Sequence, residues 1–153
     1  MPAENIVKNP SFEQGIDYWN VDNGGEGGTI QVVDEGVKGK ALLIDCPGVS
    51  KSCSTYQYFA NGNQPTTPLY IGYWIKPVKK EGTSLTALGV FETFPTNPKL
   101  TTFNYGSFII KVKNPQQWEK KEFIVTPIME PESVTVDVLN YIGGSSTTYY
   151  DDI

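Results

Sequence analysis

Two residue types are absent from the 153-residue chain, and each absence excludes a class of chemistry. There is no histidine, which removes the commonest general base and the commonest transition-metal ligand. There is no arginine either, so all twelve positive charges are lysines and bidentate recognition of phosphate or carboxylate groups is unavailable. Because the net charge is -5 and no basic run occurs, we expect no nucleic-acid partner.

Long apolar runs and helical patterns are missing as well. No run reaches the length of about 18 apolar residues that a membrane span needs, so we expect no membrane-spanning segment. No stretch of a dozen residues keeps apolar positions at helical spacing without glycine, proline or β-branched interruptions. A chain of this length buries one substantial core, and we expect a single domain over residues 1–153.

The sequence is instead a series of short segments that are rich in β-branched and aromatic residues and bounded by turn residues. Strands are predicted in or near 5–13, 29–34, 40–45, 54–59, 69–76, 85–94, 103–112, 119–126, 133–141 and 148–153. This spacing indicates an all-β fold, a β-sandwich or jelly roll of two antiparallel sheets.

Alternation of apolar residues assigns faces to two of the predicted strands. The apolar sides are Leu69, Ile71, Tyr73 and Ile75 in one strand and Val134, Val136 and Val138 in the other. Trp74 then points away from the first apolar side, and Asp137 and Tyr141 point away from the second. A face that combines an aromatic ring with a carboxylate suits a sugar, although ordinary solvent-facing strands have the same composition.

The two ends of the chain carry carboxylates that we expect to meet. Residues 5–13 are predicted to form a short strand followed by a turn that carries Glu13, and the closing strand carries Asp151 and Asp152. Pairing of the two ends brings these like charges together, which is destabilising unless a cation offsets them. Oxygen ligands without histidine or cysteine suit Ca²⁺, and the polar turn 34–40 is placed to add a backbone carbonyl. The alternative is that these residues are merely exposed acids near the chain ends.

The two cysteines flank a turn-rich loop. Cys46 and Cys53 lie on either side of residues 47–52, between two predicted strands. A disulfide across this loop is geometrically reasonable in an oxidising compartment, but two cysteines alone do not establish one.

Four stretches, spread in order over the whole chain, carry a resemblance to a known family. They are 9–15 followed by Trp19, 39–42, 69–76, and a closing third that holds Trp118, 123–126, 134–136 and 150–153. Together they resemble the carbohydrate-binding modules of the family 4, 9, 16 and 22 type, which are galactose-binding-like β-sandwiches. The resemblance implies a non-catalytic, extracellular module that is linked to a secreted polysaccharide-degrading enzyme. The implied ligand is a neutral β-linked glycan such as xylan, β-glucan or cellulose.

The resemblance also implies site residues. A structural Ca²⁺ would be held by the side chains of Glu13 and Asp151 and the backbone carbonyls of Ser11 and Lys40, with Asp152 in reserve. A glycan groove would cross one sheet, with Phe94, Tyr105 and Tyr141 stacking on sugar rings and Gln57, Glu92 and Asp137 as hydrogen-bonding partners. By the same resemblance, Trp19 and Trp118 belong to the core.

One of these assignments depends on strand register, because a shift of one residue would expose Tyr56 and Tyr58 in place of Gln57. Two other functions stay open at this point. Glu92 and Asp137 would form the carboxylate pair of a glycosidase if their strands were neighbours. Alternatively, the chain is a structural or adhesive module without a sugar site, whose sign would be a sizeable exposed apolar patch.

Overall fold

The computed structural model describes residues 4–22, 27–47, 53–62, 64–65, 68–80, 86–93, 102–109, 116–125, 132–140 and 145–153. Its strands are β1 (Asn20–Asp22), β2 (Thr29–Val33), β3 (Ala41–Pro47), β4 (Cys53–Ala60), β5 (Leu69–Lys80), β6 (Thr86–Thr93), β7 (Thr102–Ile109), β8 (Glu119–Val125), β9 (Ser133–Asn140) and β10 (Ser145–Asp151). No helix interrupts them in these ranges, and none there would be long and apolar enough to cross a membrane.

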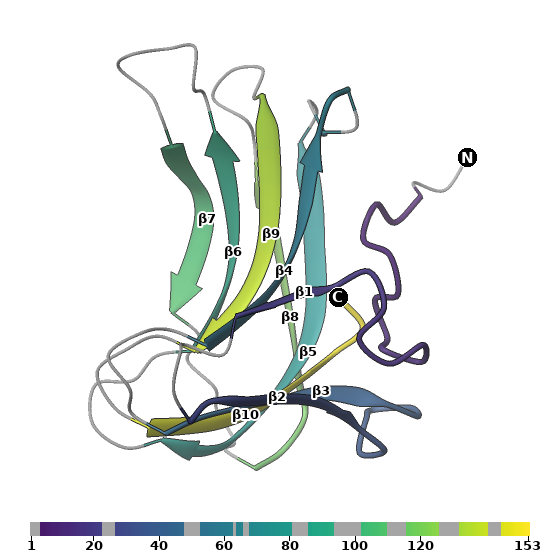
Figure 1. Ribbon diagram of the computed structural model, residues 1–153, viewed down its shortest axis with the longest axis vertical. Helices are drawn as coiled ribbons and strands as arrows, with labels where there is room; N and C mark the ends of the chain where they lie inside the picture. The colour runs from purple at the N-terminus through teal and green to yellow at the C-terminus, as the bar shows by residue number, and fades with distance from the viewer. Residues whose placement is uncertain are drawn as a thin grey trace.

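The strands form two five-stranded sheets. Sheet A has the order β1-β4-β9-β6-β7, and sheet B has the order β2-β3-β10-β5-β8. All of the strand pairs in both sheets are antiparallel. In Figure 1, β2, β3 and β10 run across the foot of the upright strands β4, β9, β6 and β7. The predicted all-β sandwich of two antiparallel sheets is therefore confirmed.

The core lies between the two sheets and includes the residues of β5 and β9 that alternation predicts. Its fully buried side chains include Leu42, Ile44, Tyr73, Ile75, Val134, Val136, Val138 and Tyr150. Ile71 belongs to the same cluster, whereas Trp74 is only half-buried. The period-2 pattern of β5 and β9 thus assigned the inward faces of both strands correctly.

The opening segment differs from the prediction, because residues 4–19 form turns and no strand. Asn9 and Phe12 both have positive φ, of 49° and 58°, which a strand does not allow. The Asn9 side chain stabilises the loop instead of strand hydrogen bonds, because its amide nitrogen donates to the carbonyls of Gly15 and Asp17. Phe12 is fully buried and stacks on Trp19 at 5.3 Å. The core position predicted for Trp19 is therefore confirmed.

The two ends of the chain still meet, as expected. Ile153 donates its N–H to the carbonyl of Pro10 at 3.1 Å, and Asn5 donates to the carbonyl of Ile153. In Figure 1 the label of the C-terminus lies beside the purple N-terminal coil. Contact between the ends therefore depends on loop hydrogen bonds, because the strand predicted for 5–13 does not form.

Trp118 does not lie in the core, so that prediction is wrong. It is half-buried, and the Lys76 ammonium lies 5.2 Å from its ring centroid and 4.4 Å from that of Tyr149. Lys76 and Tyr149 are directly paired in register, on β5 and β10. The tryptophan thus packs on neighbouring sheet B side chains through cation–π and edge contacts.

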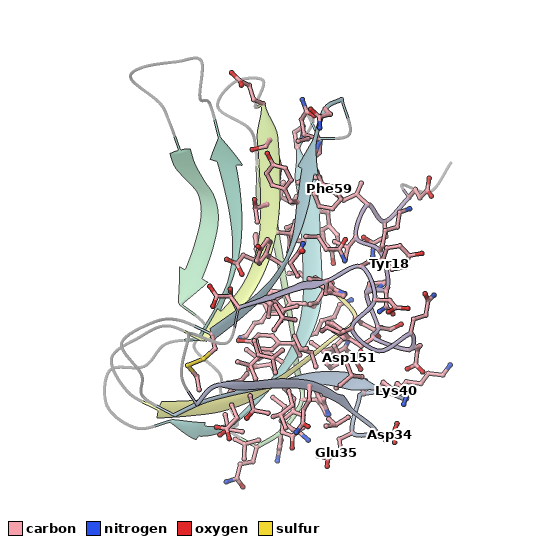
Figure 2. The ribbon with its side chains drawn as sticks, in the orientation of Figure 1. Tyr18, Asp34, Glu35, Lys40, Phe59 and Asp151 are labelled. Atoms are coloured by element: carbon pink, nitrogen blue, oxygen red, sulfur yellow. A yellow bond between two sulfur atoms is a disulfide. The ribbon has the colours of Figure 1, made fainter. Side chains whose placement is uncertain are left out.

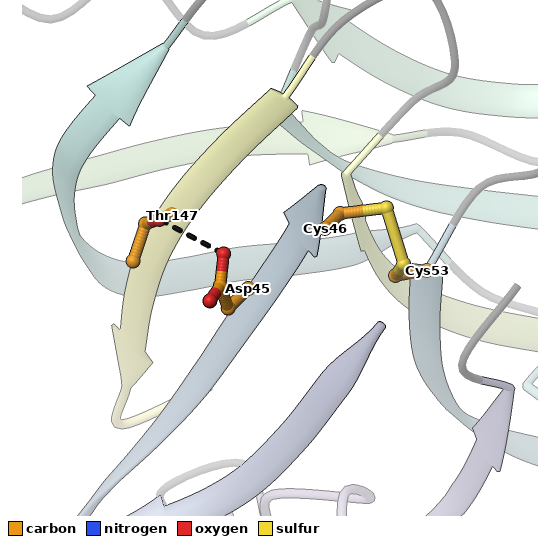
Figure 3. Close-up of a disulfide and its surroundings, with 4 residues drawn as sticks. All are labelled: Asp45, Cys46, Cys53 and Thr147. Atoms are coloured by element: carbon orange, nitrogen blue, oxygen red, sulfur yellow. Dashed lines mark hydrogen bonds between the residues drawn. A yellow bond between two sulfur atoms is a disulfide. The ribbon is translucent and has the colours of Figure 1, made fainter. Parts of the chain in front are cut away.

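A disulfide joins the two sheets. Cys46 at the end of β3 bonds to Cys53 at the start of β4, with a Cα–Cα distance of 5.9 Å (Figure 3). Beside it, the Thr147 hydroxyl donates to the Asp45 carboxylate at 3.1 Å (Figure 3). Because β3 belongs to sheet B and β4 to sheet A, the disulfide is a covalent link across the sandwich. It also forms the bridge that the spacing allowed.

Candidate functional site

Sheet A presents an outward face whose side chains are set by the alternation of β4. Cys53, Thr55 and Gln57 are buried, whereas Ser54, Tyr56 and Tyr58 lie on the opposite side of the strand. Tyr58 is 59% exposed, which leaves much of its ring available to a ligand. The aromatic residues on the outside of β4 are therefore the two tyrosines that the alternative register would expose.

Gln57 faces the other way, which corrects its predicted place on the glycan face. Its amide oxygen accepts the Lys8 N–H at 3.0 Å, and its amide nitrogen donates to the Lys8 carbonyl at 2.6 Å. The side chain is 4% exposed. Both ends of the amide are thus engaged by the N-terminal segment, and Gln57 holds that segment against sheet A.

The register of sheet A places Asp137 beside Tyr56. Tyr56 pairs with Asn20 on β1 and with Asp137 on β9, and Asp137 pairs in turn with Gly89 on β6. Val136 and Val138, on either side of Asp137, are buried in the core, so Asp137 faces outward as predicted.

The surroundings of Asp137 favour its protonated form. Its Oδ1 atom is buried and has no hydrogen-bond partner. Burial, together with the negative charge of Asp22, raises the pKa of Asp137 to about 7, although a hydrogen bond with the Ser54 side chain opposes the shift. The Asp137 carboxyl group lies beside Tyr56, and a carboxyl group next to an aromatic ring is suited to bind the hydroxyl groups of a ligand.

The other residues predicted for the groove are only partly placed. Glu92 lies on β6, but it is in register with Val134 and not with Asp137. Tyr105 lies on β7, the edge strand of sheet A, at the point where the pairing with β6 shifts. Phe94 and Tyr141 lie outside the described residues. Of the predicted set, the structure therefore positions the Asp137 side chain on the outward face.

The residues predicted to bind a metal lie around the turn 36–40. Among them, Asp151 is fully buried. Its Oδ2 atom accepts the Val37 N–H at 2.8 Å and its Oδ1 atom accepts the Asp152 N–H at 2.8 Å. Burial raises the pKa of Asp151 to about 6, against the effect of these bonds and of one from the Lys38 backbone. No lysine in the described ranges forms an ion pair with it.

Two further predicted ligands lie at the same turn. Glu13 accepts the Lys40 N–H at 2.8 Å through Oε1, and the Lys40 ammonium pairs with Asp34 at 2.6 Å. A Cβ atom on Gly36 would lie 2.2 Å from the Lys40 carbonyl oxygen and 2.8 Å from Asp151 Oδ2. Lys40 and Asp151 lie near each other in Figure 2, with Asp34 on the adjoining turn.

This donor set fits a hard cation. The Lys40 carbonyl and the Asp151 carboxylate lie next to Gly36, and the Glu13 carboxylate lies next to Gly39 in the same turn. In the described part of the chain no three acidic, cysteine or histidine side chains form a metal-binding cluster, so backbone carbonyls would have to complete the shell. Ser11 lies next to Pro10, whose carbonyl accepts the Ile153 N–H, and is therefore close to the closing segment.

Asp152 takes a different place from its neighbour. It is exposed, it has a positive φ of 48°, and its negative charge contributes to the raised pKa of Lys120 on β8. The predicted reserve ligand thus lies at the surface and acts electrostatically on Lys120. Sequence reasoning also did not identify Asn9 as the organiser of the opening loop, although an Asn-Pro step is a known turn signal.

Comparisons with known proteins agree with this architecture. No family model and no curated protein matches the sequence. Among solved structures, the TmCBM61 module in complex with β-1,4-galactotriose matches with a TM-score of 0.63 at 19% identity, over 98% of this chain and 96% of that one. The CBM22-2 xylan-binding domain of Paenibacillus barcinonensis Xyn10C matches with a TM-score of 0.60 at 16% identity, over 94% of both chains.

A third structure comes from an adhesin. The K1 cleaved adhesin domain of Lys-gingipain from Porphyromonas gingivalis W83 matches with a TM-score of 0.57 at 12% identity, over 93% of this chain and 92% of that one. At such identities the likeness concerns the fold. The chain therefore has the β-sandwich fold of carbohydrate-binding modules such as TmCBM61 and CBM22-2.

Proposed function

We propose that the chain is a non-catalytic carbohydrate-binding module that binds a polysaccharide on the outward face of sheet A. The observation that carries the proposal is the set formed by Tyr56, Tyr58 and Asp137, two aromatic rings and a carboxyl group on adjacent strands. Modules of the same fold bind β-1,4-galactotriose and xylan. Their ligands support a glycan as the class of ligand here.

The chemistry of the face matches that of a neutral sugar. A pyranose ring has an apolar C–H face, which stacks on an exposed aromatic ring, and hydroxyl groups at its edge. Tyr58 offers the exposed ring, while Asp137 and Ser54 offer hydrogen-bonding atoms farther along the same face, around Tyr56. The absence of arginine also favours a neutral glycan, such as xylan, β-glucan or cellulose, over an acidic one.

A structural Ca²⁺ is part of the proposal. Asp151 and Glu13 would hold it by their carboxylates, and Lys40 and Ser11 by their backbone carbonyls. The support is the buried Asp151 carboxylate, which has no cationic partner among the described residues, and the space at Gly36. Such an ion would offset the charge at the junction of the chain ends.

We also infer an extracellular location and a covalently linked polysaccharide-degrading enzyme in the parent protein. The Cys46–Cys53 disulfide supports the location, because such bonds persist in oxidising compartments. The support for the linked enzyme is the resemblance to modules that are attached to such enzymes.

The alternative is an adhesive module, which an exposed apolar pair favours. Tyr70 and Ile124 are directly paired in register on β5 and β8, and both are largely exposed. The adhesin domain of Lys-gingipain has the same sandwich. On this alternative sheet A binds no glycan.

Calorimetric titration with xylotetraose, cellotetraose and β-1,4-galactotriose tests the proposal. We expect saturable heat with at least one, and a loss of about tenfold in affinity for Tyr58→Ala, because one lost stacking contact is worth roughly 1.4 kcal/mol. Tyr18→Ala is the matched control, since Tyr18 is 65% exposed but lies in the loop before β1. Equal affinities of both variants and the native chain would remove sheet A as the site.

A further inference from the structure

A second aromatic surface lies on sheet B, on the strands β5 and β8. Tyr70 is 62% exposed at the start of β5, and it alternates with the core residue Ile71. Its ring is therefore turned away from the core, on the side of β5 that also carries Gly72 and Trp74. None of these residues belongs to the site proposed on sheet A.

The ring of Tyr70 is held in place by its neighbours. Its hydroxyl donates a hydrogen bond to the Glu122 carboxylate on β8, and Lys120 forms an ion pair with the same carboxylate at 2.9 Å. Glu122 is directly paired with Gly72 in the register of the sheet. The tyrosine is thus anchored from across the strand pair, so its side chain loses little conformational entropy when a ligand stacks on it.

Gly72 determines how the ring lies. A Cβ atom at this position would meet the Cε1 and hydroxyl atoms of Tyr70 at 3.3 Å, which is tighter than ordinary van der Waals contact. The ring therefore lies along β5, over the place where a side chain of residue 72 would be. This arrangement gives the strand a flat aromatic platform, with an anchored edge and an exposed face.

The platform borders a cavity of about 780 Å³. Its lining includes Tyr70, Gly72, Trp74, Lys120 and Asp152, together with residues 4–7 of the N-terminal segment and Val136 of sheet A. The cavity therefore extends from the outward side of β5 to the chain ends and to sheet A. This volume is within the range of small-molecule sites, which is about 300–1,000 Å³. The cavity is therefore large enough for a short oligosaccharide.

The charges around the cavity indicate the class of ligand. The Lys120 ammonium lies next to Glu122, and the charge of Asp152 acts on it as well. The lining carries two carboxylates, of Glu4 and Asp152, and one ammonium, of Lys120. The site therefore offers donors and acceptors for hydroxyl groups, and its acidic excess disfavours an anionic ligand. An aromatic face with such an edge is complementary to a neutral pyranose.

We propose that the cavity beside Tyr70 is a second saccharide-binding site, which takes a short neutral glycan or the end of a glycan chain. Tyr70 stacks on the sugar ring, and Trp74 forms part of the apolar wall. Lys120 and Asp152 bind hydroxyl groups at the edge. A chain with one site on the outward face of sheet A and a second beside β5 would contact a polysaccharide at two points and gain avidity.

Titration of ¹⁵N-labelled protein with xylotetraose, cellotetraose and β-1,4-galactotriose, followed by amide NMR shifts, tests this proposal. We expect saturable shifts at the amides of Gly72, Trp74 and Lys120 with at least one sugar. They should be lost in Tyr70→Ala and kept in Ile124→Ala, which removes the exposed apolar residue paired with Tyr70. Tyr70→Phe retains the ring but loses the Glu122 anchor, so it should bind with an affinity lowered severalfold.

The same titration separates this proposal from the function proposed for sheet A. Shifts at Tyr56 and Tyr58 without shifts at Gly72 and Lys120 would overturn the second site and leave the first. Shifts confined to β5 and β8 would support the second site and remove the first. A loss of binding in Ile124→Ala equal to that in Tyr70→Ala would also overturn the proposal, because it would indicate general apolar contact. Thermal unfolding of each variant confirms that it is folded.

Discussion

Asp151 Oδ2 accepts the N–H of Val37 at 2.8 Å and so joins the last strand to a turn 114 residues earlier in the chain. Asp151 is fully buried, and this contact holds a negative charge at the junction between β10 and the turn 36–40. An unpaired buried carboxylate costs stability. The burial of this charge is the reason that we propose a cation at the junction.

We expect Ca²⁺ to raise the melting temperature of the native chain by several degrees, because a ligand that binds only the folded state stabilises it. Asp151→Asn should abolish this increase. Asp152→Asn is the control, since Asp152 is the adjacent residue but is exposed. Differential scanning calorimetry with Ca²⁺ and with a chelator measures the shift. An unchanged Ca²⁺ effect in Asp151→Asn would exclude this carboxylate as a ligand.

Gly39→Ala should destabilise the chain more than Gly15→Ala. Both glycines have positive φ, of 82° and 66°, so alanine is strained at either place, at a cost of about 1 kcal/mol. Only at residue 39 would the new Cβ meet a neighbour, the Glu13 Oε1 atom at 2.2 Å. Urea unfolding should therefore give an extra loss of about 1 kcal/mol or more for Gly39→Ala. Equal losses would mean that Glu13 shifts without cost.

Removal of the Cys46–Cys53 disulfide should lower the free energy of unfolding by about 2–3 kcal/mol, the value that loop-closure entropy gives for a loop of this size. The double variant Cys46→Ser/Cys53→Ser, compared with the native chain in guanidinium unfolding, measures this loss. A reducing agent should lower the stability of the native chain alone. An equal response of both proteins to the reductant would contradict the role of the bond.

Gln57→Ala should weaken the fold without weakening glycan binding. The substitution removes both hydrogen bonds to the Lys8 backbone, and we expect a loss of about 1–3 kcal/mol in urea unfolding. Glycan affinity should stay within about twofold of the native value, since the side chain faces away from Tyr56 and Tyr58. A large loss of affinity in a variant that remains folded would return Gln57 to the glycan site.

The raised pKa of Asp137, about 7, predicts a pH dependence of stability. Since the folded state holds this proton more tightly than the unfolded chain, the contribution of Asp137 is fully present below about pH 4. It is lost as the pH rises toward 7. Asp137→Asn removes the ionisation and should be more stable than the native chain at pH 8, by about 1 kcal/mol or more. Denaturant unfolding at pH 5 and pH 8 measures the difference. A native advantage at pH 8 would show that the carboxylate has a favourable partner there.

Glycan affinity should respond to the same titration. If ionised Asp137 accepts a sugar hydroxyl, affinity rises from pH 6 to pH 8 in the native chain and stays flat in Asp137→Asn. Calorimetry at these two pH values separates the binding role of the group from its effect on stability, because the heat of binding is measured on folded protein.

Local patterns were sufficient for the fold class and the inward faces. The period-2 alternation in β5 and β9 depends only on the pleat of each strand, so it assigned Tyr73, Ile75, Val136 and Val138 to the core without any knowledge of neighbouring strands. The disulfide was likewise visible in the sequence, because a loop of six residues keeps its two flanking cysteines close together. The carboxylates at the chain ends could also be identified from the sequence.

The tertiary structure decided which residues from different strands and loops contact each other. The face of β4 depends on the hydrogen bonds between Gln57 and Lys8, which join segments 49 residues apart and leave no local signal. The same holds for Trp118, whose place depends on Lys76 and Tyr149 from two other strands, and for the Tyr70 platform, which needs Glu122 across the sheet. The sequence by itself determined an all-β sandwich with acidic ends, because side-chain alternation is local. Only tertiary packing decided which aromatic rings face a ligand, because a shift of one residue in register reverses every face.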